Sequence, residues 1–146
     1  MFSNKNKSQI FILLLIFISF FARVYGQIMV AIYDIDWLPP MSQWYSGLIP
    51  YPYLLFCQLL IMCSMFLLLI DCMISYRALV VSQKIEKGIL IFSYIYGSIM
   101  TLRYILTMAF IPEQRWFVGT IPIFMHLGLA LFLYIWVQIK QNQRQI

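Results

Sequence analysis

Four long apolar runs account for most of this chain, and they limit what it can fold into more than any other feature. They cover residues 10–33, 51–70, 88–110 and 117–139. Each run is close to the roughly 20 residues that an α-helix needs to cross about 30 Å of hydrocarbon at about 1.5 Å per residue. We therefore predict an all-α fold, one integral membrane domain in which four transmembrane helices form an up-and-down bundle.

Composition indicates that lipid, not water, is the solvent for most of the chain. Of the 146 residues, 63% are hydrophobic and 10% are charged, whereas a soluble domain carries about 25% charged residues. Residues 34–50, between the first two runs, are enough for a loop but not for a domain. The chain lacks a serine–histidine–aspartate set, paired intramembrane carboxylates, an H-E-x-x-H sequence and a glycine-rich phosphate loop. An enzyme is therefore disfavoured, and neither a cofactor nor a metal ion is expected.

The basic residues predict an orientation. An even number of crossings places seven of them on one side of the membrane: Lys5, Lys7, Arg77, Lys84, Lys87, Lys140 and Arg144. The opposite side has only Arg115, together with the tryptophans Trp37 and Trp44 of an aromatic belt. By the positive-inside rule, both termini should be cytoplasmic. The net charge of +5 follows this topology and forms no single basic face, so a nucleic-acid partner is not expected.

The first run has a second interpretation. Lys5 and Lys7, the apolar residues 10–22 and a small residue just before Gln27 are typical of a cleaved signal peptide. Against cleavage, Arg23 lies close to the proposed site and apolar residues resume after Gln27. We expect an uncleaved first span.

Polar side chains inside the apolar runs are the candidate site. Arg23, Gln58, Arg103 and His126 each come from a different run and lie roughly 10 to 15 Å below the outer helix ends at about 1.5 Å per residue. An arginine at mid-membrane costs about 2.5 to 3.5 kcal/mol on insertion scales. We predict that these four side chains face one another in a positively charged intramembrane pocket that opens outward.

Neighbouring residues support this layer. Gln27 lies one turn from Arg23 on the same helix face, and Tyr96 shares the face of Arg103. Pro122 lies one turn before His126 and should kink the fourth helix or free a carbonyl above it. Small residues at four-residue spacing, such as Ala22 with Gly26, should let helices approach closely.

Each candidate also has a structural interpretation. The arginines are satisfied by carbonyls, by glutamines or by reaching up to the headgroups, or else they contact an anionic ligand, a lipid headgroup or a partner subunit. His126 is a hydrogen-bonded bundle histidine, a ligand contact or proton carrier, or a haem or metal ligand.

Two short segments resemble a family. Residues 46–53 contain Ile49-Pro50-Tyr51 ahead of Gln58, and residues 115–126 contain an IP-x-F-x-H pattern that ends at His126. These segments are similar to those of uncharacterised, small four-span proteins of the bacterial inner membrane. The resemblance implies four spans and an inner-membrane location, and it implies no activity, ligand or partner.

The leading hypothesis for function is a non-enzymatic subunit or accessory factor, embedded in the lipid bilayer, whose polar layer engages a membrane protein partner or an anionic lipid-like molecule. One alternative is a small transporter or channel in which a homo-oligomer supplies the pathway. Another is a membrane enzyme that binds a quinone-like or haem-like group near Arg103 and His126.

Overall fold

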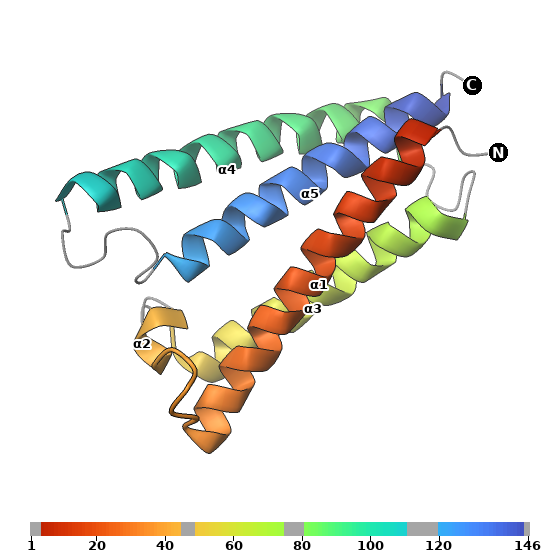
Figure 1. Cartoon of the computed structure of the whole chain (residues 1–146). Helices are drawn as coiled ribbons and strands as arrows, with labels where there is room; N and C mark the ends of the chain where they lie inside the picture. The colour runs from red at the N-terminus through yellow and green to blue at the C-terminus, as the bar shows by residue number, and fades with distance from the viewer. Residues whose placement is uncertain (1–3, 45–48, 75–80, 111–119, 145–146) are drawn as a thin grey trace.

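The computed structural model describes residues 4–44, 49–74, 81–110 and 120–144. These residues form five helices (Figure 1): α1 (Asn4–Tyr33), α2 (Met41–Trp44), α3 (Tyr51–Ile74), α4 (Gln83–Phe110) and α5 (Ile121–Arg144). Four of them are long and apolar enough to cross a membrane. The predicted all-α bundle with four candidate spans is confirmed, and the chain is a multi-pass membrane protein.

All four long helices extend beyond the apolar runs because polar residues at the flanks continue the helix. α1 begins at Asn4, α3 continues through Asp71 to Ile74, α4 begins at Gln83, and α5 continues through Lys140 to Arg144. The hydroxyl of Ser82 caps the start of α4 by accepting a hydrogen bond from the amide of Ile85 at 3.4 Å. The expected start of the fourth span at residue 117 lies outside the described residues.

Local chemistry explains the end of α1 and the start of α3. Asp34 has a φ of 46°, a left-handed conformation that aspartate tolerates. It terminates α1, and its amide donates back to the carbonyl of Val30 at 3.1 Å. Pro52 lies in the first turn of α3, where the amide that proline lacks has no partner within the helix.

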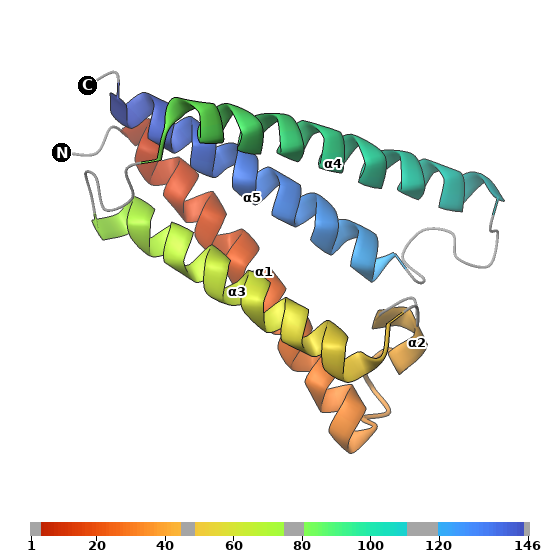
Figure 2. The same ribbon diagram turned by 180° about the vertical axis from the view of Figure 1, so that it is seen from behind.

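The long helices form two antiparallel hairpins, α1 with α3 and α4 with α5 (Figure 1). The hairpins lie close together where α1 begins and α5 ends, and they diverge toward the end that carries α2, as the reverse view also shows (Figure 2). We call these the termini end and the α2 end. Helix α5 contacts α1, α3 and α4, whereas α4 packs on α5 alone among the described helices.

The hydrophobic core lies between α1, α3 and α5. Its centre includes Phe20 of α1, Met65 of α3, and Phe132 and Trp136 of α5. Most large apolar side chains of α4, such as Ile95, are exposed. Because lipid is as apolar as these side chains, their exposure carries no hydrophobic penalty in a bilayer.

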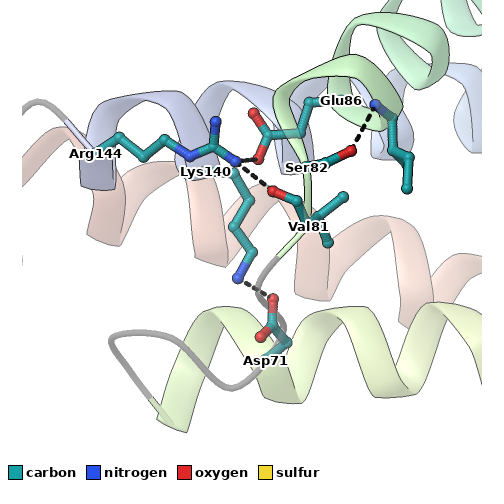
Figure 3. Close-up of polar contacts among 7 residues, drawn as sticks. Asp71, Val81, Ser82, Glu86, Lys140 and Arg144 are labelled. Atoms are coloured by element: carbon teal, nitrogen blue, oxygen red, sulfur yellow. Dashed lines mark hydrogen bonds and ion pairs between the residues drawn. The ribbon is translucent and has the colours of Figure 1, made fainter.

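Among the described residues, two ion pairs join the helices at the termini end (Figure 3). Lys140 of α5 pairs with Asp71 of α3. Arg144 of α5 pairs with Glu86 of α4 at 2.5 Å and donates to the carbonyl of Val81 at the same distance. Both carboxylates are buried. α5 is therefore held to α3 and to α4 by charge as well as by packing.

Candidate functional site

The polar stripe of α1 lies on the packed face of that helix. Buried positions recur every three or four residues, at Phe20, Arg23, Gln27 and Val30, which is the period of a helix face in contact with its neighbours. Only 9% of Arg23 and none of Gln27 is exposed. Two polar side chains therefore lie among the apolar residues of this packed face.

Gln58 of α3 meets this stripe. It is 4% exposed, and its side-chain amide donates to the Oε1 atom of Gln27 at 3.0 Å. The bond joins α1 to α3, six residues before the end of α1 at Tyr33 and seven residues after the start of α3 at Tyr51. The structure thus brings Arg23, Gln27 and Gln58 together, and we call these three residues the amide–arginine cluster.

Helix α2 packs against the Arg23 side of this cluster. Nη2 of Arg23 donates to the carbonyl of Trp44 at 2.8 Å, and the indole N–H of Trp44 donates to the carbonyl of Pro39 at 2.7 Å. The indole ring lies against Gly26, where an added Cβ would come within 2.9 Å of its Cη2 atom. Gly26 therefore accommodates an aromatic side chain rather than a second long helix.

The aromatic belt expected at this end is only partly present. Trp37 is 81% exposed, as an interfacial residue should be, but Trp44 is 7% exposed and belongs to the site. This role of Trp44 was not predicted from the sequence. One sequence feature could have indicated this role: a small residue in an apolar helix, followed by a proline pair and an aromatic residue.

Tyr96 and His126 form a second polar pair, between α4 and α5. The tyrosine hydroxyl and Nδ1 of His126 are 2.5 Å apart, and the two rings meet edge to face at 83°. Both residues are half-buried. His126 lies within electrostatic range of Arg23 and Arg103.

Arg103 does not join the buried residues. Its side chain is exposed, in a shallow hollow lined by apolar residues of α4 such as Leu102 and Leu106. Tyr96, expected on the same face, turns instead toward α5. Of the four predicted side chains, Gln58 bonds to Gln27, one turn from the buried Arg23, whereas Arg103 is exposed. A shared pocket that opens outward stays a prediction.

Pro122 lies in the first turn of α5 as that helix is described, where its missing amide needs no partner. Proline at this position does not require the kink in α5 that was expected. The carbonyl of Val118, which it was expected to free, lies outside the described residues.

The amide–arginine cluster has unsatisfied hydrogen-bonding capacity. Within the described part of the chain, three of its buried atoms have no hydrogen-bond partner: Arg23 Nε, Gln27 Nε2 and Gln58 Oε1. Among the described residues, no carboxylate lies within ion-pair distance of Arg23. Buried polar groups in proteins are almost always hydrogen-bonded, so an unpaired set of this kind calls for a partner. A positive charge with free donors is suited to an anion.

Metal binding has little support in the residues that the structure covers. No three histidine, cysteine, aspartate or glutamate side chains lie close enough there to hold an ion.

Comparisons with protein-family models, with curated proteins and with solved structures find no match to this chain. The resemblance seen at residues 46–53 and 115–126 therefore identifies no family, and any function must be argued from the geometry.

Proposed function

We propose that this protein is a non-enzymatic membrane subunit or accessory factor that binds an anionic, lipid-like molecule at the amide–arginine cluster. The observation that carries the proposal is the buried guanidinium group of Arg23, which has no carboxylate partner among the described residues. Burying a charge is costly unless it is paired and hydrogen-bonded. The carbonyl of Trp44 satisfies one N–H of this group but does not neutralise its charge.

The depth of Arg23 in the membrane favours a ligand that is part of the bilayer. The 30 residues of α1 correspond to about 45 Å, against about 30 Å of hydrocarbon. With α1 centred, Arg23 lies about 8 Å inside the hydrocarbon boundary, ten residues from the helix end at Tyr33. A long arginine side chain spans much of that distance. An anionic headgroup drawn slightly inward would reach it while its acyl chains stay in lipid.

Residues of the other hairpin lie outside the cluster. His126 of α5 is in electrostatic range of Arg23 and, separately, of Arg103. Charges act over several ångströms in a medium of low dielectric constant, but the exposed Arg103 is not part of the cluster. Direct contact is assigned to Arg23, Gln27 and Gln58.

Mass spectrometry of the protein purified in a mild detergent tests the proposal. The wild-type protein should retain a stoichiometric anionic amphiphile, and Arg23→Gln should lose it, whereas Arg23→Lys should keep part of it because the charge remains. Arg103→Gln is the matched control, since it removes an exposed intramembrane arginine and leaves the cluster intact. Its complex should persist.

Two results would count against the proposal. One is a wild-type protein that carries no anionic molecule at any detergent concentration that preserves the fold. The other is retention by Arg23→Gln together with loss by Arg103→Gln, which would move the site to the outer face of α4. Circular dichroism of each variant verifies that helix content is unchanged.

A further inference from the structure

The two glutamines of the cluster present the same chemistry however their amides are oriented. As placed, Gln58 Nε2 donates to Gln27 Oε1, which leaves Gln27 Nε2 and Gln58 Oε1 without partners among the described residues. The oxygen and nitrogen of an amide are assigned from the hydrogen-bond network. Rotating both side-chain amides by half a turn reverses the direction of this hydrogen bond. Gln27 Oε1 and Gln58 Nε2 are then the atoms left without partners. In both cases one amide donor and one amide acceptor remain unpaired.

Together with Arg23 Nε, the cluster has two donor atoms and one acceptor atom without partners among the described residues. An anion such as a simple phosphodiester or a carboxylate brings acceptors only. It would satisfy the guanidinium and the amide N–H, but the glutamine carbonyl would stay unpaired. Leaving one buried acceptor unsatisfied costs as much as a hydrogen bond gains, or more.

The missing group on the ligand must therefore be a hydrogen-bond donor. An ammonium group would place a second positive charge beside the buried guanidinium of Arg23, which is unfavourable at low dielectric constant. A hydroxyl group donates without adding charge. A ligand that satisfies this cluster thus carries one negative charge and, a few bonds away from it, a hydroxyl group.

We infer that the anionic ligand of the amide–arginine cluster is a phosphate diester that also carries a free hydroxyl, as a phosphoglycerol headgroup does. The phosphate accepts from Arg23 and from one glutamine amide, and the hydroxyl donates to the carbonyl of the other glutamine. The inference rests on the proposed function and adds the chemical class of the ligand. The same chemistry occurs in a lipid headgroup and in a free glycerol phosphate ester.

Two lipids that differ only in the hydroxyl-bearing part of the headgroup provide the test. Phosphatidylglycerol and phosphatidylethanol each carry one negative charge on a phosphodiester, but the ethyl group has no hydroxyl. With the wild-type protein in nanodiscs of zwitterionic lipid, titration of each should show a preference for phosphatidylglycerol of about threefold to tenfold, the worth of one hydrogen bond. Equal binding of the two lipids would overturn the inference and leave the proposed function standing. If neither lipid binds, the proposed function itself fails.

Variants test which residues cause the preference for phosphatidylglycerol. Because either glutamine can present the acceptor, both must change: Gln27→Met with Gln58→Met removes the amide groups at similar volume. This double variant should still bind anionic lipid through Arg23 but should bind the two lipids equally. If it keeps the preference for phosphatidylglycerol, the hydroxyl is recognised elsewhere and the inference is wrong. The comparison on the wild-type protein is informative even if the double variant does not fold.

A competition experiment distinguishes the two sources of the ligand. Displacement of bound phosphatidylglycerol by millimolar glycerol phosphate methyl ester would support the inference and assign a water-soluble ligand. Absence of displacement, with the preference between the two lipids retained, would support it and assign a lipid headgroup.

Discussion

Replacing Gly26 by alanine tests the contact between Gly26 and Trp44 that holds α2 against the site. An alanine Cβ would lie 2.9 Å from Cη2 of Trp44, whereas carbon atoms pack best at about 3.5 to 4.0 Å. The indole must therefore move by about 0.6 to 1.1 Å to reach that separation. It is not a free side-chain end, because its N–H donates to Pro39 and the backbone carbonyl of the same residue accepts from Arg23.

Two opposing effects set the change that Gly26→Ala should cause in the free energy of unfolding. Overpacking a well-packed site typically costs about 1 to 3 kcal/mol. Alanine is favoured over glycine in a helix interior by about 0.8 to 1.0 kcal/mol. Gly26→Ala should therefore lower the free energy of unfolding by roughly 0 to 2 kcal/mol. Gly88→Ala is the matched control, since an added Cβ there meets none of the described residues within 4 Å. It should raise the free energy of unfolding by up to about 1 kcal/mol.

The assay is reversible unfolding in mixed detergent micelles, followed by circular dichroism, with tryptophan emission recorded at each point. Gly26→Ala should also shift the emission of the folded protein to longer wavelength, because a displaced Trp44 becomes more exposed. If Gly26→Ala stabilises the protein as much as Gly88→Ala and leaves the emission unchanged, then Trp44 does not lie on Gly26. In that case α2 does not pack against the site.

Two further predictions concern the other polar contacts. Lys140→Met should lower the free energy of unfolding by about 3 to 5 kcal/mol, because it removes the ammonium partner of a buried carboxylate. Adding Asp71→Leu should recover most of that loss in a double-mutant cycle, and strictly additive effects would contradict a coupled pair. Tyr96→Phe should cost about 0.5 to 1.5 kcal/mol through its lost bond to His126. Tyr25→Phe, at an exposed tyrosine, should change stability little in the same titration, so equal losses for the two would refute the role of the Tyr96 bond.

The amide–arginine cluster was partly predictable. Arg23, Gln27 and Gln58 stood out in the sequence because lipid excludes polar side chains unless something holds them. The four-residue spacing of Arg23 and Gln27 was also sufficient to place them on one helix face. Neither their proximity to Gln58 nor the carbonyl of Trp44 could be derived in this way, since both depend on which helices are neighbours.

Arg103 shows why depth alone does not define a site. Residue counting placed it near the level of His126, yet its side chain is exposed on α4. In a soluble helix the polar face marks the solvent side, and an internal polar residue breaks a clear pattern. In lipid both faces of a helix are apolar, so hydropathy carries little information about which way α4 is turned.

The amino-acid sequence was enough to predict four helices able to cross a membrane, because transfer of each apolar run into lipid is local and nearly additive along the chain. It also indicated which polar residues need a partner. Which of them meet depends on the folded bundle, since the rotation of each helix and its neighbours are set by close packing, interhelical hydrogen bonds and ion pairs. Those contacts buried Arg23 beneath α2, joined Lys140 to Asp71 and left Arg103 facing outward.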